Sequence, residues 1–371
     1  MDPKIAKKLF ENGAIFVLLN VPEGTEFGID LKSWNTGEKF RGVKMVPPGI
    51  HYIFYSSVSN TGDTAPRTGF FHFFKKSEVY VKKWDNITQG ISTEEVSNKD
   101  VGLTDNLKVL DRFLGPYPYD ILDRWKILTA NITENLLKKL NPLCGEVRSA
   151  LELENCCDAD RPRGSRSETG ESSSKRLRNS HGEDDLLPYL QPKDGTELRL
   201  TQFPEKCYPE GSSPSEITTH SLDSTYVLEK MIHTYLQPTD ILGELELCYI
   251  CFLVGHSLEA FEQWKKLFSL LCSCERALIK YRKIYDLFLN VVELQVKEVP
   301  EEFIADIVTN NNFVYAKLRD LFRFIRNSDA DDQLKCKAER LRKSLKHSCK
   351  WDFGNLDLEE EDEAPVVVEL G

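Results

Sequence analysis

The chain has 371 residues, of which 40% are hydrophobic and 29% charged, so it can bury a core and is not disordered throughout. Its 48 Lys and Arg residues against 59 Asp and Glu residues give a net charge of −11, which argues against strong direct binding to nucleic acid. The most apolar stretch, residues 241–254, contains two glutamates and is shorter than the roughly 20 apolar residues of a membrane span.

The 10 cysteines do not have the regular spacing of a disulfide framework. The first apolar run, residues 14–19, is too short to be the hydrophobic core of a secretory leader. Cysteines in such a chain stay reduced inside the cell. We therefore expect a soluble protein of the cytoplasm and nucleus, with no membrane partner.

Residues 1–150 are expected to form a β-rich domain with some helices at its end. Short runs of β-branched and aromatic residues are separated by Gly, Pro and Asn: AIFVLLN (14–20), KFRGVKMV (39–46), IHYIFYSS (50–57), GFFHFF (69–74) and VYVKKW (79–84). In the third run, Ile50, Tyr52 and Phe54 face one way and Ile53 and Tyr55 the other. Two apolar faces indicate a sandwich, or a sheet that is covered on both sides.

Two local patterns complete this region. Pro47-Pro48-Gly49 separates the second and third runs and predicts a β-hairpin, because proline and glycine suit the corners of a type II turn. Helical spacing begins near Thr104 and is interrupted at residues 115–118. A further helix is expected over residues 119–140.

Residues 151–192 are expected to form a disordered linker, because they contain few large apolar residues and many Ser, Arg and acidic residues. The simplest function of such a segment is to tether two domains. Ser180 precedes Glu183, Asp184 and Asp185, which makes it a candidate phosphorylation site for an acid-directed kinase. The basic residues 175–178 match a nuclear-import signal only weakly.

Residues 193–353 are expected to be α-helical. Residues 213–216, SPSE, have the pattern of a capping box, and Thr239 and Gly255 are expected to begin and end another helix. Three apolar stripes follow at helical spacing: Leu258, Phe261, Trp264, Phe268 and Leu271; Leu278, Tyr281, Ile284, Phe288 and Val291; and Leu334, Ala338, Leu341 and Leu345. Six or seven such helices without a fixed sequence repeat predict a bundle or a short superhelix.

No catalytic, cofactor or metal site is expected, so the sequence does not indicate an enzyme. Cys248 and Cys251 have the spacing of half a zinc site, but they lie in an apolar helix without a second pair of ligands. We therefore interpret them as core residues, and Cys272 and Cys274 likewise. His220, Ser221 and Asp223 are neighbours on one helix, where side chains diverge by about 100° per residue and cannot converge as a triad.

Residues 354–371 are expected to form an extended acidic tail. From Asp357 onward the segment has seven acidic residues and no basic one. Three valines follow Pro365, and valine favours strands over helices. The segment Val366-Val367-Val368-Glu369-Leu370 is therefore a candidate β-strand that pairs with a sheet edge, either in a partner or in this chain.

Long blocks of the sequence closely resemble the AAR2 family. In chain order they are GTEFGID (24–30), KFRGVKMVPPGIH (39–51), LGPYPY (114–119), GTELR (195–199), DILGEL (240–245), CFLVG (251–255), AFEQWKKLF (260–268), WDF (351–353) and APVVVEL (364–370). The resemblance implies an α+β fold with a sandwich-like N-terminal domain and a VHS-like helical C-terminal domain. It covers most of the chain except the linker and the regions near 60–100 and 275–350. Because the linker carries no matching block, the resemblance does not place a phosphorylation site at Ser180.

The resemblance also implies a function. Members of the family are non-enzymatic assembly chaperones of the spliceosomal U5 small nuclear ribonucleoprotein (snRNP). They bind the RNase H-like and Jab/MPN-like domains of Prp8 and delay binding of the helicase Brr2. In the family the tail adds a strand to its partner, which maps here onto Val366, Val367, Val368, Glu369 and Leu370. Two alternatives are a VHS-like trafficking adaptor and an enzyme in the β-domain.

Overall fold

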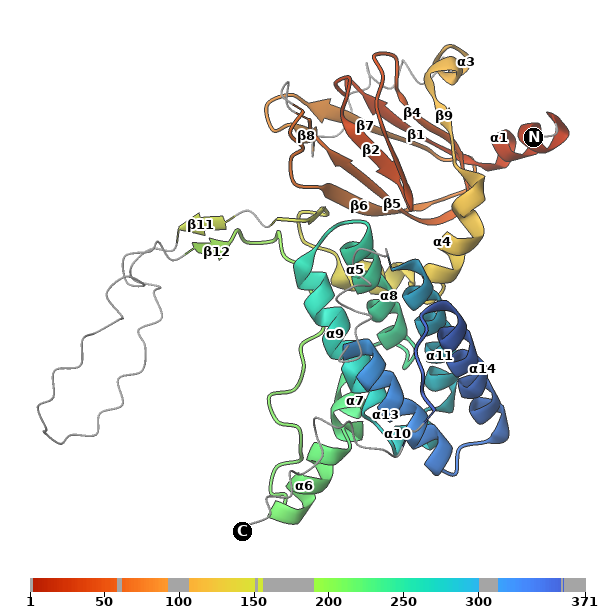
Figure 1. Ribbon diagram of the computed structural model, residues 1–371. Helices are drawn as coiled ribbons and strands as arrows, with labels where there is room; N and C mark the ends of the chain where they lie inside the picture. Colours follow the sequence, from red (N-terminus) through yellow and green to blue (C-terminus); the bar gives the residue numbers. More distant parts are fainter. Residues whose placement is uncertain are drawn as a thin grey trace, which may run out of the picture.

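The computed structural model describes residues 3–58, 62–92, 107–150, 153–155, 190–299, 313–354 and 356. Two β-sheets occupy the N-terminal part of the chain, and helices form the C-terminal part (Figure 1). The expected α+β fold is therefore confirmed. Within these residues, no helix is both long enough and apolar enough to span a membrane.

Each sheet has five strands. The order in the first sheet is β8 (Gly90–Ile91), β7 (Val79–Asp85), β1 (Ala14–Leu19), β4 (Gly42–Val46) and β9 (Gly115–Pro116). The order in the second is β10 (Val147–Arg148), β6 (Thr68–Phe74), β5 (Gly49–Ser56), β2 (Glu26–Ile29) and β3 (Lys32–Asn35). The second sheet is antiparallel throughout, whereas β1 pairs in parallel with β7 and antiparallel with β4.

The two sheets pack face to face around an aromatic core. Phe16 of β1 lies between Phe27 of β2 and Phe70 of β6, with ring centroids 6.0 and 6.2 Å away. Ile53 and Tyr55 of β5 belong to the same core. Side chains from both inner faces therefore share one hydrophobic layer, as the alternation in these strands predicts.

The outer face of β5 is also buried, because the helices cover it. Ile50, Tyr52 and Phe54 belong to the core of the helical region rather than to that of the sandwich. Trp125, on helix α4 (Leu122–Leu128), is 1% exposed and donates from Nε1 to the Ile50 carbonyl over 2.7 Å. The prediction of a sheet covered on both sides is confirmed at this strand.

The hairpin predicted at Pro47-Pro48-Gly49 is wrong. β4 ends before this segment in the first sheet, and β5 begins at Gly49 in the second. The segment is therefore a corner by which the chain crosses from one sheet to the other. Gly49 does adopt a positive φ, of 135°, but it starts a strand there instead of closing a turn.

The single helix predicted over residues 119–140 is also wrong. The chain forms a short 3-10 helix (Tyr119–Ile121), then α4, and then α5 (Glu134–Leu140). Between the two α-helices, Asn131 binds a carboxylate of another helix, and the Thr133 side chain accepts from the Leu136 amide as the N-cap of α5. Asn131 thus has its partner outside the predicted helix, and Thr133 begins a new helix.

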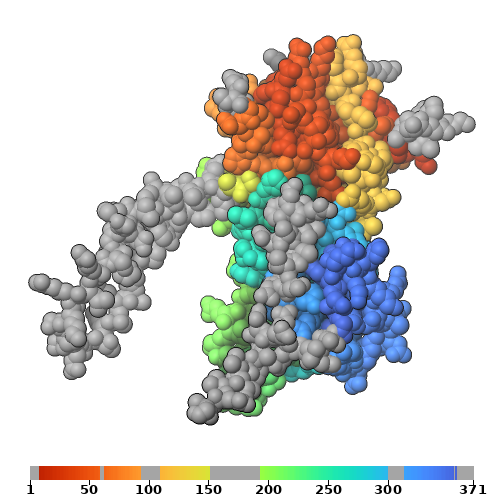
Figure 2. All heavy atoms as spheres, viewed as in Figure 1, coloured from red at the N-terminus to blue at the C-terminus, as the bar shows by residue number. Residues whose placement is uncertain are grey.

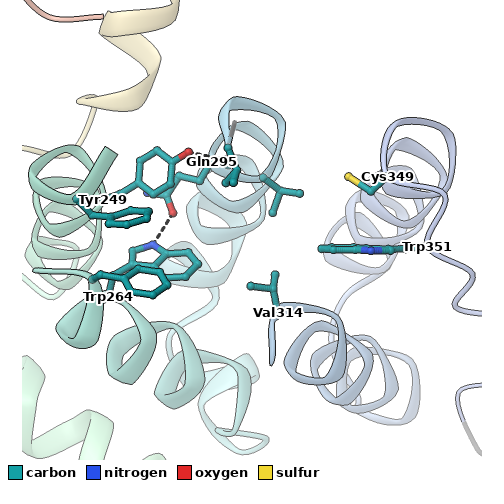
Figure 3. A pocket seen from close by; sticks show the side chains of 10 residues that line it. Tyr249, Trp264, Gln295, Val314, Cys349 and Trp351 are labelled. Atoms are coloured by element: carbon teal, nitrogen blue, oxygen red, sulfur yellow. Dashed lines mark hydrogen bonds between the residues drawn. The ribbon is translucent and has the colours of Figure 1, made fainter. Parts of the chain in front are cut away.

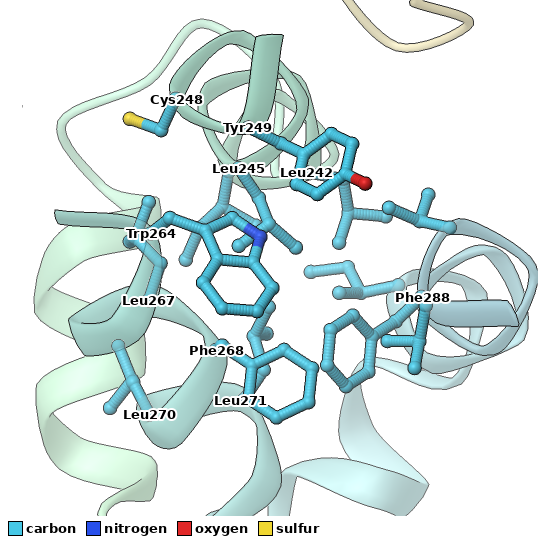
Figure 4. Packing of buried hydrophobic residues seen from close by; sticks show 14 of the residues in the cluster. Leu242, Leu245, Cys248, Tyr249, Trp264, Leu267, Phe268, Leu270, Leu271 and Phe288 are labelled. Carbon is cyan, nitrogen blue, oxygen red and sulfur yellow. The ribbon is translucent and has the colours of Figure 1, made fainter. Parts of the chain in front are cut away.

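The helical region is built around α8 (Asp240–Leu253), in which residues 240–252 are all buried. The other helices are α6 (Pro214–Leu222), α7 (Thr225–Ile232), α9 (Leu258–Cys272), α10 (Ala277–Lys280), α11 (Arg282–Glu298), α13 (Phe313–Asn327) and α14 (Asp332–Ser348). Trp264 and Phe268 of α9 meet Tyr249 of α8 and Phe288 of α11 in the core (Figure 4).

Most sequence patterns of this region are confirmed. Ser213 and Glu216 form both bonds of the capping box, and the four apolar residues of the last stripe are buried on α14. Leu258 is an exception, because it is 70% exposed. Three residues turn an α-helix by about 300°, which is about 60° less than a full turn. The steps from Leu258 to Phe261 and from Phe261 to Trp264 are both of this length. Leu258 therefore lies on a different face of α9 from Trp264 and Phe268. Tyr281 is another exception, since it separates α10 from α11.

The two ends of the expected linker pair with each other. β11 (Leu153–Asn155) and β12 (Leu190–Pro192) form an antiparallel two-stranded ladder (Figure 1). The residues between them, 156–189, lie outside the described part of the chain, and Ser180 is one of them.

The close approach of α8 to the connection between α4 and α5 depends on Gly243. A Cβ atom at this position would overlap the Asn131 carbonyl oxygen and the Leu136 side chain. We predict that Gly243→Ala destabilises the protein by about 1–3 kcal/mol, although alanine is the better helix former. Thermal or denaturant unfolding measures this loss.

Gly37→Ala is the matched control for this substitution. Gly37 is exposed and has no atom within 4 Å of a built Cβ, so the control should leave the free energy of unfolding nearly unchanged. Equal stability of both variants would contradict the tight contact at Gly243.

Candidate partner-binding surface

The sandwich and the helical region are joined as one body by polar contacts as well as by their shared core. Arg67, just before β6, donates to the Val254 carbonyl after α8 over 2.7 Å and to Glu26 of β2 over 2.7 Å. Its guanidinium also lies 4.5 Å from the centre of the Phe54 ring. The space-filling view shows the two regions in direct contact (Figure 2).

Two buried glutamates of α8 bind segments from elsewhere in the chain. Glu244 accepts from the Thr201 amide and hydroxyl, the Tyr235 hydroxyl and the Gln263 side chain. Glu246 accepts from the amide and the side chain of Asn131, over 2.7 and 2.6 Å. Both carboxylates are thus used to attach loops to the central helix.

The burial of Glu246 has an electrostatic consequence. Removal from water raises the pKa of its carboxyl to about 8, although the hydrogen bonds from Asn131 act in the opposite direction. At neutral pH this side chain therefore binds a proton more readily in the folded state than in the unfolded one.

A second buried polar cluster lies at the corner between the sheets. His51 places Nδ1 2.6 Å from Asp30 Oδ2 and Nε2 2.8 Å from the Pro47 carbonyl oxygen, so both ring nitrogens have a partner. Asp30 also accepts from the Tyr117 hydroxyl over 2.6 Å, and burial raises the pKa of Tyr117. Asp30, His51 and Tyr117 are each at most 3% exposed, so the cluster belongs to the interior of the protein.

The cysteines interpreted as core residues are indeed buried. Cys248, Cys251, Cys272 and Cys274 are each at most 1% exposed, and burial raises the pKa of all four thiols. Buried thiols of high pKa are poor nucleophiles. Among the described residues, no group of three or more His, Cys, Asp or Glu side chains is placed to hold a metal ion.

The residues with the composition of a triad do not converge. The Ser221 hydroxyl donates to the Ile217 carbonyl in its own helix, and the His220 ring packs against Tyr226. Asp223 accepts from Thr225 and Arg276. The three side chains therefore have separate structural roles, as their neighbouring positions predict.

A partly enclosed cavity in the helical region is small and apolar. It lies between α8, α9 and α11 on one side and α13 and Trp351 on the other (Figure 3). Its volume of about 20 Å³ is sufficient for one water molecule but not for a metabolite. In it, Trp264 donates from Nε1 to Gln295 Oε1 over 2.9 Å.

An open groove offers a more suitable binding surface. It lies beside the edge strands β8 and β10, has a volume of about 890 Å³, and includes residues of both sheets and residues 193, 194 and 196. Both edge strands have only two residues, and Ile87 at the groove is 93% exposed. Both charged side chains, such as Lys83, Glu146 and Arg148, and apolar ones line it. The edge of a β-sheet can pair with an added strand, and the charged and apolar side chains beside it can contact the side chains of that strand. This groove is therefore suited to binding a polypeptide.

The structure does not describe the site residues that the sequence predicts, so it does not relate them to this surface. Val366, Val367, Val368, Glu369 and Leu370 fall outside the described residues, as does Ser180. Conversely, the sequence did not predict that the groove residues form one surface, because they come from segments that are distant in sequence. Glu244 and Glu246 did carry a signal, since two acidic residues within an apolar helix need buried partners.

We predict that Glu246 makes the protein less stable as pH rises from about 5 to about 8. In this range the unfolded chain has released the proton and the folded chain still holds it, so the free energy of unfolding falls. Each unit of difference in pKa contributes about 1.4 kcal/mol. Glu246→Gln should therefore show a weaker decline in melting temperature over this range.

Glu262→Gln, on the exposed face of α9, is the control for removing one carboxylate. Its profile of melting temperature against pH should follow that of the unmodified protein. If Glu246→Gln also followed it, the buried carboxyl would not hold a proton in the folded state.

Two family models match the chain. The model described as AAR2 N-terminal domain matches residues 12–142, and the one described as AAR2 C-terminal repeat region matches residues 200–354. The first match contains the buried cluster of Asp30, His51 and Tyr117, and the second contains α6 to α14.

Whole proteins show the same relationship. The human and mouse proteins named Protein AAR2 homolog are each 39% identical to the chain, over 100% of its length and 97% of theirs. The Caenorhabditis elegans protein of the same name is 34% identical, over 95% of the chain and 98% of its own length.

Proposed function

The chain belongs to the AAR2 family, and we propose on this basis that it is a non-enzymatic assembly chaperone of the U5 snRNP in pre-mRNA splicing. The observation that carries the proposal is the similarity over the full length of curated relatives, which includes the helical region and the tail blocks. We place this activity in the cytoplasm and nucleus.

The proposed partner is Prp8, through its RNase H-like and Jab/MPN-like domains. Binding there delays the helicase Brr2 in a precursor particle. The buried polar clusters of the described residues are used for internal hydrogen bonds, so the support for a binding protein comes from the surface. An open groove beside two sheet edges is, by contrast, accessible to a protein.

Affinity capture tests the class of function. The chain with an affinity tag should recover Prp8 and other U5 proteins from a cell lysate, as identified by mass spectrometry. Recovery of endosomal sorting proteins instead would favour the alternative of a trafficking adaptor.

We further propose that residues 366–370 pair as a β-strand with a sheet edge of Prp8. In an extended strand Val366, Val368 and Leu370 point to one side, so these three enter the apolar surface of the partner. Burial of each contributes on the order of 1.5–3 kcal/mol, which the ordering of a flexible segment partly offsets. The tail therefore binds weakly alone and depends on the folded body to hold it at high effective concentration.

Truncation after Glu363 is predicted to weaken the complex with Prp8 at least tenfold, or about 1.4 kcal/mol, and to leave the melting temperature nearly unchanged. Calorimetry and thermal unfolding measure the two effects. Val367→Pro should also weaken binding because it removes a backbone donor, whereas Val367→Ala retains the donor and is the matched control. A truncated chain that bound equally well, or melted much earlier, would contradict the proposal.

Ser180 is the proposed phosphorylation site that regulates release. A phosphate would add a charge of roughly −1.5 to −2 beside Glu183, Asp184 and Asp185, which extends the linker by repulsion. Ser180→Glu is therefore predicted to weaken the complex with Prp8, and Ser180→Ala to leave it unchanged. If the two variants bound Prp8 with equal affinity in the same calorimetric assay, Ser180 would not be the site that regulates release.

A further inference from the structure

Ser213-Pro214 is the one place in the sequence where a serine or threonine precedes a proline. Proline-directed protein kinases select their acceptor residue by the proline that follows it, because proline has a fixed φ and no amide hydrogen. The sequence thus offers a kinase of this class a single acceptor, the Ser213 hydroxyl. Ser213 is also the N-cap of α6, so its side chain has a structural role that a modification would change.

The segment around Ser213 is accessible. No residue from 202 to 222 is buried, and Ser213 itself is exposed. α6 lies at the end of the helical region that is distant from the sheets (Figure 1). Residues 202–212 belong to no helix or strand, and Ser213 has the extended backbone angles φ −67° and ψ 160°. Kinases bind their substrates as extended segments, so this side of the acceptor already has a suitable conformation.

On the other side of Ser213, a kinase has to open the first turn of α6. This helix has nine residues, none of them buried, and so short a helix is marginal in water without packing. Its start is held by the capping box, in which the Ser213 amide donates to Glu216 Oε2 over 2.7 Å and the Glu216 amide donates to Ser213 Oγ over 3.4 Å. Opening this turn breaks local bonds and exposes no core, so its cost in free energy is small.

We propose that a proline-directed kinase phosphorylates Ser213, and that the phosphate then displaces the Glu216 carboxylate from the capping box of α6. In the reaction, Ser213 Oγ forms a bond to the γ-phosphorus of ATP while the bond from that phosphorus to the bridging oxygen of ADP breaks. The hydroxyl proton passes to the catalytic base of the kinase, and ADP leaves. The proposal concerns only this chain and a kinase, so it does not depend on the proposed binding to Prp8.

The phosphate weakens the bonds that Ser213 gives to Glu216. The hydroxyl donates to Glu216 Oε2 over 2.8 Å, and a phosphoester oxygen has no proton to donate. The added charge of roughly −1.5 to −2 also repels the carboxylate. In the unmodified chain, hydrogen bonds from the Ser213 amide and hydroxyl hold the pKa of Glu216 below its usual range. Phosphorylation should therefore raise this pKa and release the carboxylate to solvent.

The helix itself is retained after this exchange. The first amide groups of a helix have no partners within it, and the helix dipole favours an anion at this end. Phosphate oxygens on Ser213 accept from these amides more strongly than the neutral hydroxyl does. The exposed end of α6 then carries the phosphate and a free carboxylate, which together favour a basic partner and disfavour an acidic one.

Phosphorylation in vitro tests the site. The full chain is incubated with ATP, Mg²⁺ and a mitogen-activated protein kinase, and mass spectra of the intact chain and of its peptides count and locate the phosphate. One phosphate per chain is expected, on Ser213. Ser213→Ala should abolish the modification, and Pro214→Ala should slow it at least about tenfold, because the residue that the kinase selects is lost.

Other serines provide the controls. Ser215→Ala removes an exposed serine of the same turn and should be phosphorylated as fast as the unmodified chain. Ser257, the N-cap of α9, is 3% exposed and precedes a leucine, so it should take up no phosphate. A peptide of residues 207–219 shows whether the sequence alone is a substrate. Modification of the peptide but not of the chain, of neither, or of the Ser213→Ala chain to the same extent would overturn the site.

Carboxyl and amide NMR spectra of the phosphorylated chain test the exchange of caps. The Cα shifts of residues 217–222 should stay helical, and the pKa of Glu216 should rise into its usual range. Ser213→Asp is the control for a charged cap, because aspartate caps helices well but carries less charge than phosphate, so it should raise this pKa less. Random-coil shifts in α6, or a pKa of Glu216 that phosphorylation leaves unchanged, would contradict the displacement of this carboxylate.

Discussion

Strand β5 is the element on which the rest of the structure depends, because both of its faces are buried in different cores. Ile53 and Tyr55 close the aromatic layer between the two sheets, while Ile50, Tyr52 and Phe54 form the surface on which the helices pack. A strand that is apolar on both sides cannot be exposed without a large loss of hydrophobic free energy. The sandwich and the helices are therefore held together at the centre of the molecule.

Polar residues keep this arrangement specific. Asp30, His51 and Tyr117 fix the corner at which the chain leaves one sheet for the other, and Glu246 fixes the connection between α4 and α5 against α8. Each of these groups is buried and would be costly to leave without its partners. A body made rigid in this way is a suitable base for a tail, since it holds the tail close to whatever the body itself contacts.

The distribution of charge adds a second level of organisation. The acidic residues of the tail follow the basic helices α13 and α14 directly in the sequence, and Trp351, Phe353 and Leu356 attach the connecting segment to these helices. Net charge alone conceals this feature, since the two segments partly cancel.

Local patterns in the sequence were sufficient to predict the α+β fold, the strand with two apolar faces, the capping box at Ser213 and the buried cysteines, because periodicity and capping depend on near neighbours. The AAR2 resemblance came from long blocks in fixed order. Only the tertiary structure decided that residues 47–49 turn a corner between sheets, that Asn131 interrupts a helix to bind Glu246, and that edge strands β8 and β10 border one groove. In each case the deciding partner is distant in the sequence, so no local pattern contains it.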